Sequence, residues 1–414
     1  MCHYKSFRQT VQQQLRRRIR VESVSTNTKI NSEKRKAAPS RWLIPIVLVA
    51  CLLIGVGISR GQQPAATVGA IPAPATPLPA EELSAGVTRF SFIAYGDTRS
   101  SVDGTAPQPI HTQLVDAMVT SIKRMQTTDF PIRFVLQSGD AVTNGRNVNQ
   151  WNTSFIDIVS RLTQEANVPY YLIPGNHDVT TATSVGAPNR NTGLKNYFDA
   201  MANLIPPDDS PRRLSGYPTY AFGYGNTFII GIDSNISPDE TQFNWVKTQL
   251  EGLNRTRFVN VIAFLHHGPF TSGNHRVAEL ATLGVRLRYM PLFRTHHVAA
   301  VLGGHDHEFE HFVEHYTDRT GLHRMDLIIS AGGGAPLYGY TGEPDTADYL
   351  ASGASARVRL DHIVKPFPVA ADNKYHFIII RVDGNKLSIE AVALDPAANF
   401  NPYGPDKVVF DLRD

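Results

Sequence analysis

The sequence predicts an α/β protein in which two packed sheets form the core of one folded domain. Five short apolar runs are separated by longer amphipathic segments, which is typical of strands that alternate with helices in a largely parallel sheet. Two further pairs of β-rich runs have the spacing of hairpins, and we expect them to form a second sheet packed on the first. These pairs are 220–224 with 228–232, and 375–382 with 387–392.

The core strands are expected where apolar runs of four to eight residues end in polar or glycine-containing sequence. They are 90–95, 132–137, 168–173, 258–265 and 298–302. After the first run, apolar residues recur at helical spacing from Ile110 to Met125, which predicts an amphipathic helix. A second helix is expected over 238–253, with Ser237 as its capping residue and Pro238 in its first turn.

Charge and cysteine content exclude two classes of function for the folded region. The chain of 414 residues has a net charge of +3, but residues 1–41 hold 11 Lys or Arg against 2 acidic residues. Residues 42–414 therefore carry 29 basic and 35 acidic side chains, a net charge of −6, which argues against nucleic-acid binding. Both cysteines, Cys2 and Cys51, precede the domain, which excludes a disulfide framework or a cysteine metal site within it.

Residues 42–58 form an apolar run without a charge and follow basic residues at 34, 35, 36 and 41. The run is just long enough to span ~30 Å of hydrocarbon as a helix, and its basic flank predicts a cytoplasmic amino terminus. We therefore expect an uncleaved, single-pass signal anchor. A cleaved signal peptide and a lipoprotein modified at Cys51 are the alternatives. All three place the rest of the chain outside the cytoplasm, in the periplasm or at the cell surface.

Four regions follow from these patterns. Residues 1–41 are expected to be a basic cytoplasmic tail, 42–58 a transmembrane anchor, and 89–414 the folded domain. Residues 59–88 hold five prolines between Pro64 and Pro79. Because such a segment favours an extended polyproline II conformation, we expect a linker that does not pack.

A polar cluster follows each of the five expected core strands. The clusters are Gly96-Asp97-Thr98-Arg99, Gly139-Asp140, Gly175-Asn176-His177-Asp178, His266-His267-Gly268-Pro269 and Gly304-His305-Asp306-His307. Since the carboxyl ends of strands in α/β sheets converge on a crevice, we expect these side chains to meet there. Their carboxylate, amide and imidazole groups suit divalent ions such as Mn, Fe or Zn. The glycines that precede Asp and Asn are expected to let the backbone turn sharply.

The succession of these clusters resembles the calcineurin-like metallophosphoesterases. The later run at 331–338, Ala-Gly-Gly-Gly-Ala-Pro-Leu-Tyr, resembles their purple acid phosphatase-like branch, and the whole resemblance spans about residues 90–395. It implies a four-layer α/β/β/α sandwich with two packed mixed sheets and a site at the carboxyl ends of the strands. It also implies a hydrolase of phosphomonoesters or phosphodiesters that uses two divalent metal ions.

The resemblance further implies a ligand set. The first metal would be bound by Asp97, Asp140 and His307, and the second by Asp140, Asn176, His266 and His305. Asp140 would bridge two cations ~3.5 to 4 Å apart, the separation used for in-line displacement. His266 is preferred over His267 because of its position before the Gly268-Pro269 pair.

The sequence departs from the family pattern at the first metal. Arg99 stands where many members have a histidine ligand, and Thr143 stands where purple acid phosphatases have a tyrosine ligand. Arg99 stays protonated and cannot bind a metal, so we expect it to contact a substrate phosphate instead. His111 is an alternative source of the missing ligand, or else a solvated residue near a helix start.

The expected reaction is in-line attack on phosphorus by a hydroxide shared between the two metals. His177 is expected to protonate the leaving oxygen, with Asp178 orienting its imidazole. His275, in the loop after His266, is expected to reach the substrate.

Each cluster taken singly has a plainer explanation, because Asp and Asn commonly cap turns and many histidines are solvated. Independent turns, however, have no reason to assemble one ligand set. The rival function is a catalytically silent metal-binding or ligand-binding domain, for which the missing histidine at position 99 is the best argument. Asp233 is expected to support a turn, and the run 332–334 a tight backbone passage near the crevice. No protein partner is inferred.

Overall fold

The computed structural model describes residues 66–100, 106–181, 184–188, 190–394, 400–404 and 407–412. They belong to the second of two units into which the chain divides, Pro64–Asp414. The anchor expected at 42–58 lies outside these residues. Within the described ranges, no helix combines the length and the apolar character needed to cross a membrane.

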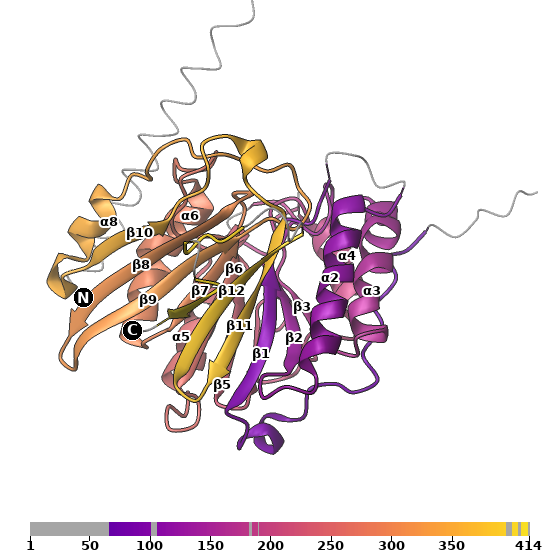
Figure 1. Ribbon diagram of the computed structural model, residues 1–414, viewed down its shortest axis with the longest axis horizontal. Helices are drawn as coiled ribbons and strands as arrows, with labels where there is room; N and C mark the ends of the chain where they lie inside the picture. The colour runs from indigo at the N-terminus through magenta and orange to yellow at the C-terminus, as the bar shows by residue number, and fades with distance from the viewer. Residues whose placement is uncertain are drawn as a thin grey trace, which may run out of the picture. The chain divides into compact units, whose positions relative to one another are not determined.

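Two mixed sheets pack face to face in this unit (Figure 1). The first has the strand order β13-β12-β11-β1-β2-β3, in which β1, β2 and β3 are parallel. Its strands are β1 Arg89–Tyr95, β2 Ile132–Gln137, β3 Tyr170–Leu172, β11 His376–Asp383, β12 Lys386–Ala393 and β13 Val409–Leu412. The second has the order β10-β8-β9-β7-β6-β5-β4, in which β5, β6, β7 and β9 are parallel. Its strands are β4 Tyr220–Tyr224, β5 Thr227–Ile232, β6 Asn260–His267, β7 Ala300–Gly304, β8 Phe309–Asp318, β9 Gly321–Ser330 and β10 Arg359–Val364.

Helices cover the outer face of each sheet, which completes the expected four layers (Figure 1). The first sheet is covered by α2 Pro109–Met125, α3 Asp157–Gln164 and α4 Asn191–Met201. The second is covered by α5 Glu240–Glu251, α6 Leu280–Gly284 and α7 Met290–Thr295. A further short helix, α8 Ala347–Ser352, precedes β10.

The central strands are largely apolar because both of their faces are buried. In β5, Phe228 and Ile230 pack under the helices of the second sheet, while Ile229 points into the core between the sheets. Successive side chains of a strand point to opposite faces, so one continuous apolar run serves both layers. The two core clusters together account for the α/β/β/α order.

The assignment of strands to sheets differs from the expectation. The five apolar runs do form parallel strands, but β1, β2 and β3 lie in the first sheet and β6 and β7 in the second. The hairpin at 375–392 was expected in the second sheet and instead extends the first, antiparallel to β1. Local spacing identifies a strand, but its partner is decided by packing between segments far apart in the chain.

The hairpin of β8 and β9 was not predicted. In β8 the side chains of Glu310, His311 and Glu314 are buried. Because these buried residues are polar, the sequence lacks the apolar/polar alternation by which a strand is predicted. Arg294 forms an ion pair with Glu314 at 3.0 Å, and His311 lies 2.8 Å from Asp326 on β9. Buried charged groups need such partners, which lie elsewhere in the sequence.

Of the two predicted helices, α2 confirms the first, and α5 begins later than expected. Asp239, not Ser237, caps α5, because its carboxylate accepts a hydrogen bond from the backbone N–H of Gln242 at 2.8 Å. The Ser237 hydroxyl donates instead to the carbonyl of Ala281 at 2.7 Å.

The described part of the expected linker packs against the domain. Val68 and Ile71 are buried in the core, and the Ile71 N–H donates to the Ala200 carbonyl at 2.8 Å. Asn203 donates to the carbonyl of Ile71 at 3.1 Å. A proline-rich composition predicts an extended chain but does not show whether the chain lies along a surface.

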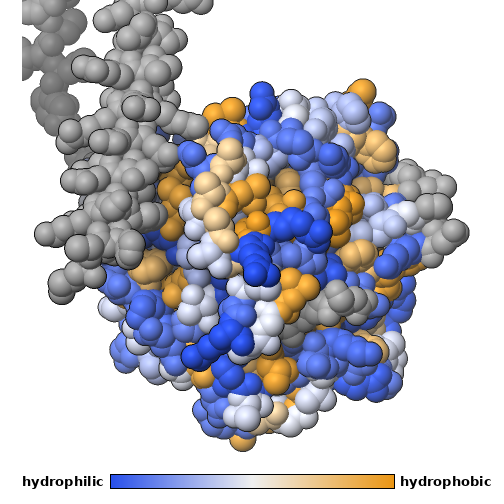
Figure 2. Space-filling view, turned by 90° about the vertical axis from the view of Figure 1, so that its left-hand side faces the viewer, coloured by the Kyte–Doolittle hydropathy of each residue, from blue (hydrophilic) through white to orange (hydrophobic). Residues whose placement is uncertain are grey.

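The exposed surface of the described residues shows no large apolar patch that would indicate a binding site on the face seen in Figure 2. On the face seen in Figure 2, hydrophilic and hydrophobic residues form small interleaved groups. Among the described residues, the exposed large apolar side chains are Leu83, Val277, Leu322, Ile363, Phe367, Val369 and Val408, of which three lie within 363–369. Exposed apolar residues in small number are normal on a protein surface, so we look for the functional site in the polar clusters.

The packing of the proline-rich segment is tested by Ile71→Ala. Removing this fully buried side chain should lower the free energy of unfolding by about 2 to 5 kcal/mol, as for other buried aliphatic residues. Leu83→Ala is the matched control, because Leu83 is 81% exposed and its truncation should change stability little. Urea unfolding followed by tryptophan fluorescence measures both, and equal stability of the two variants would contradict the packing.

Candidate metal centre

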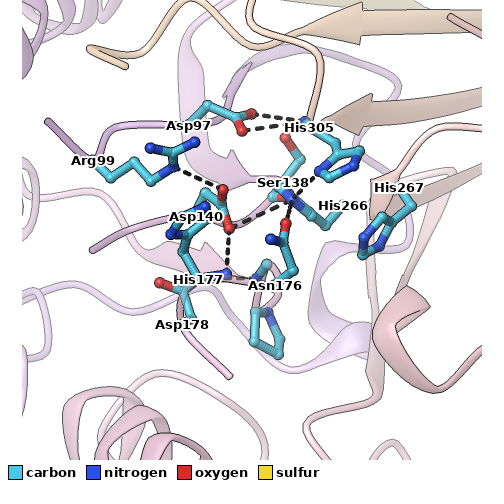
Figure 3. A network of polar contacts seen from close by, with 12 residues as sticks. Asp97, Arg99, Ser138, Asp140, Asn176, His177, Asp178, His266, His267 and His305 are labelled. Carbon is cyan, nitrogen blue, oxygen red and sulfur yellow. Dashed lines mark hydrogen bonds and ion pairs between the residues drawn. The ribbon is translucent and has the colours of Figure 1, made fainter. Parts of the chain in front are cut away.

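The five polar clusters lie together at the carboxyl ends of β1, β2, β3, β6 and β7 (Figure 3). Backbone hydrogen bonds join the loops: the Asp97 N–H donates to Gly139 at 2.9 Å, and the Arg99 N–H donates to Asp140 at 3.0 Å. The N–H of Gly333 donates to Gly96 at 2.9 Å, which confirms the expected backbone passage beside the crevice. The first three loops belong to one sheet and the last two to the other, so the site lies where the sheets meet.

The backbone at this site differs from the expectation for its glycines. Among the glycines that precede the predicted ligands, Gly139 has a positive φ of 103°, but Asp97, Asp140 and His305 themselves have φ of 60°, 53° and 77°. Left-handed backbone costs roughly 1 to 2 kcal/mol at such residues, and this kind of strain is concentrated at functional sites. Gly175 is needed for space instead, because a Cβ there would lie 2.2 Å from Oδ1 of Asp140.

Four predicted ligands of the second metal converge. The Nδ1 atom of His266 lies 2.9 Å from the Ser138 carbonyl oxygen, which can only accept, so Nδ1 carries the proton and Nε2 offers its lone pair. This Nε2 lies 2.9 Å from Oδ1 of Asn176, 3.1 Å from Nδ1 of His305 and 3.4 Å from Oδ1 of Asp140. Burial lowers the pKa of His266 to about 3, so its ring is neutral near pH 7. Neutral imidazole, amide and carboxylate form a donor set that fits a divalent transition ion.

The neighbouring His267 has different surroundings. Its Nδ1 lies 2.9 Å from the hydroxyl of Ser234, and its ring centroid is 4.4 Å from that of His305. His266 contacts both Asp140 and Asn176, so the geometry favours His266 as the ligand.

The three predicted ligands of the first metal also lie together, but Arg99 lies among them. Oδ1 of Asp97 is 3.5 Å from Nε2 of His307. Arg99 donates from Nε to Oδ2 of Asp140 at 3.1 Å and from Nη2 to Nε2 of His307 at 3.2 Å. The guanidinium therefore contacts two of the three groups expected to bind this metal, and the set fits a metal poorly while Arg99 keeps this position.

The pKa values of the two buried carboxylates, Asp97 and Asp140, shift in opposite directions. Burial raises the pKa of Asp97 well above its usual value, and the charge of Asp140 adds to this. Burial by itself would also raise the pKa of Asp140, but the nearby His266, His177 and Arg99 reverse the shift and hold that pKa below its usual range. Asp140 is thus the carboxylate that stays ionised and attracts a cation.

The expected role of Asp178 is wrong. Its carboxylate accepts hydrogen bonds from the backbone N–H groups of Gly175 at 2.8 Å and Val142 at 3.0 Å. The imidazole of His177 is instead oriented by the carbonyl of Thr143, which lies 2.8 Å from its Nδ1. Asp178 therefore braces the loops after β2 and β3, and it supports the site without touching the ring.

His275 lies beside His305, and it contacts Glu279, a residue that the sequence analysis did not predict for the site. Its ring centroid is 3.9 Å from that of His305, and its Nδ1 is 2.8 Å from Oε1 of Glu279. Burial disfavours the charged ring, but the hydrogen bond to Glu279 and the nearby Asp306 prevail and raise the pKa of His275. Residues 275–279 precede α6 and are not helical, so no pattern in the sequence indicated this contact.

His111 is a core residue and does not replace the missing ligand. Its Nε2 lies 3.0 Å from the hydroxyl of Tyr95, and its ring stacks on Phe155 at 5.8 Å. Burial lowers the pKa of His111 to about 3. The smaller expectation for Asp233 is confirmed, because its carboxylate accepts a hydrogen bond from the N–H of Asn235 at 3.0 Å and caps a short turn.

Comparison with known families agrees with this arrangement. Residues 117–309 match the family model described as calcineurin-like phosphoesterase. The matched range includes Asp140, Asn176, His266, His305 and His307. No curated protein matches the sequence.

Solved structures of this fold resemble the domain at low sequence identity. The purple acid phosphatase isolated from yellow lupin (Lupinus luteus) seeds is 14% identical with a TM-score of 0.53, over 80% of this chain and 54% of that chain. GAP50, the anchor in the inner membrane complex of Plasmodium, is 13% identical with a TM-score of 0.43, over 79% of this chain and 89% of that chain. This chain thus spans about half the length of the lupin chain. The likeness to the lupin enzyme concerns the fold alone.

The buried state of His111 gives the domain a pH dependence that can be measured. Between pH 6.5 and about 3 only the unfolded chain protonates this ring, so acidification should lower stability by about 1.4 kcal/mol per pH unit from this residue. His111→Gln should therefore lose about 2 kcal/mol less than the wild type between pH 6.5 and 5. Urea unfolding at several pH values measures the difference, and parallel stability curves would contradict a buried, neutral His111.

Proposed function

We propose that the domain is a metal-dependent hydrolase of phosphate esters whose centre is formed by Asp140, Asn176, His266 and His305. The observation that supports this most strongly is the convergence of the other three side chains, from three loops, on the unprotonated Nε2 of the buried, neutral His266 at the end of β6. A set of turn residues without a common function has no reason to meet in this way. The rival function, a silent binding domain, leaves the adjacent His177 and His275 without a role.

Asp140, Asn176, His266 and His305 would hold a divalent cation, which would lower the pKa of a bound water toward neutral pH and offset charge on the phosphoryl oxygens. The chain provides a second, fixed positive charge in Arg99, whose guanidinium is suited to phosphate. The sequence also predicts a second ion at Asp97, Asp140 and His307, with the hydroxide between the two ions. Binding of this second ion would require Arg99 to give up its contact with Nε2 of His307.

His177 and His275 complete the proposed mechanism. Nδ1 of His177 donates to the Thr143 carbonyl, so only the doubly protonated ring would have a proton on Nε2 to give to the leaving oxygen. Glu279 favours the charged form of His275, which suits this ring to an anionic substrate group. The substrate is proposed as a phosphate ester, either a monoester or a diester.

The location of the domain remains a proposal from the sequence. The apolar run at 42–58 and its basic flank favour a domain held outside the cytoplasm by a single amino-terminal anchor.

The proposed activity is tested with chelator-treated protein. Hydrolysis of p-nitrophenyl phosphate or of bis(p-nitrophenyl) phosphate should be absent after chelation and return when Mn²⁺, Fe²⁺ or Zn²⁺ is added. The ratio of the two rates separates a monoesterase from a diesterase. Activity that persists fully in chelator, or no turnover of either ester with any of the three ions, would contradict the proposal.

The role of His177 is tested by His177→Ala. Loss of the leaving-group proton should lower kcat by roughly 10²- to 10⁴-fold. The metal content should stay as in the wild type, because the ring is not among the proposed ligands. His315→Ala is a control, since His315 lies away from the loops of the centre on β8 and is partly exposed. Loss of the metal in His177→Ala would show that the residue is a ligand.

A further inference from the structure

We infer that the guanidinium of Arg99 takes the place of one of the two expected cations, so that each chain binds a single divalent ion at the centre. This inference rests on the proposed function, because it concerns the charges of the same site. It assigns Arg99 a positioning and electrostatic role that neither the family resemblance nor the ligand spacing indicates.

His307 has one lone pair available, and Arg99 and a metal ion would compete for it. Its Nδ1 lies 2.7 Å from the Pro336 carbonyl oxygen and therefore holds the proton, so Nε2 has one lone pair. A guanidinium can only donate, so the contact of 3.2 Å between Arg99 Nη2 and this Nε2 uses that lone pair. A metal ion would need the same lone pair at ~2.0 to 2.1 Å. Arg99 and a first metal ion therefore exclude each other at His307.

The two oxygens of Asp140 are divided in the same way. Oδ2 accepts from Nε of Arg99 at 3.1 Å, whereas Oδ1 lies on the side of Nε2 of His266, at 3.4 Å. The carboxylate thus bridges a guanidinium and one metal position, in the manner expected for a carboxylate between two metals. The Asp140 carboxylate would therefore be neutralised by the fixed guanidinium of Arg99 and by one exchangeable metal ion.

The two residues that could complete the ligand set of the first metal, Thr143 and His111, have other hydrogen-bond partners. The hydroxyl of Thr143, at the place of the family's tyrosine, donates to the carbonyl of Ser100 at 2.6 Å. The ring of His111 contacts the hydroxyl of Tyr95 at 3.0 Å. Without them a first ion would have three protein ligands, two of which already bind Arg99.

The balance of charge favours one ion as well. The Arg99 side chain is only 14% exposed, and Asp97 and Asp140 are buried beside it. Even with both carboxylates ionised, two divalent ions next to Arg99 would leave three positive charges uncompensated by them, whereas one ion would leave a single excess charge. Excess buried charge of one sign is costly because few groups remain to solvate it.

The test is the metal stoichiometry of Arg99 variants. Chelator-treated full chain is titrated with Mn²⁺, bound metal is counted by calorimetry and elemental analysis, and the spin state is followed by electron paramagnetic resonance. The wild type should bind one ion and give the spectrum of isolated Mn²⁺. Arg99→His should bind two ions per chain and show exchange coupling between them, because it frees His307 and adds an imidazole ligand.

Two further variants make the result decisive. Arg124→His adds a histidine at an exposed position in the last turn of α2 and should still bind one ion. Arg99→Ala frees Asp140 and His307 without adding a ligand and should bind a second ion more weakly than Arg99→His. Exchange coupling separates a true pair of ions from a weak surface site, since only ions a few ångströms apart couple.

The outcomes distinguish this inference from the proposed function. Two coupled ions in the wild type, or a single ion in both Arg99 variants, would overturn the inference and leave the hydrolase proposal standing. Absence of bound Mn²⁺, Zn²⁺ or Fe²⁺ in the wild type would overturn both.

Discussion

The buried carboxylate of Asp140 is the group on which the rest of the centre depends. Its two oxygens contact Arg99 on one side and the His266 ring and the His177 backbone on the other. The residue has left-handed backbone, and Gly175 makes room for its side chain. A buried carboxylate is stable only when cations and donors surround it, so this one anion determines the positions of the charged groups around it.

The centre also depends on the packing of the two sheets. Asp97, Asp140 and Asn176 follow strands of the first sheet, whereas His266, His305 and His307 belong to the second. Hydrogen bonds across this boundary link His266 to the Ser138 carbonyl and the His305 N–H to the carboxylate of Asp97. The donors therefore meet only when the core between the sheets is complete, which couples folding of the domain to formation of the site.

The sequence was most informative where local chemistry is sufficient. An apolar run followed by glycine and a polar ligand identifies both a strand and the end of the sheet to which the ligand belongs. It could not predict that Asp178 bonds to backbone N–H groups, because that depends on how two loops approach each other. Nor could it predict the placement of Arg99, the burial of Ile71, or the pairing of β11 with β1, each of which is decided by contacts between distant segments.

The central claim is that one divalent ion lies among Asp140, Asn176, His266 and His305. Anomalous diffraction from a crystal of the protein loaded with Mn²⁺ tests this most directly. The account predicts a single strong peak about 2.0 to 2.3 Å from Nε2 of His266, Nδ1 of His305, and the nearest oxygens of Asn176 and Asp140. A peak bound elsewhere on the domain, with these four side chains free of metal, would contradict it.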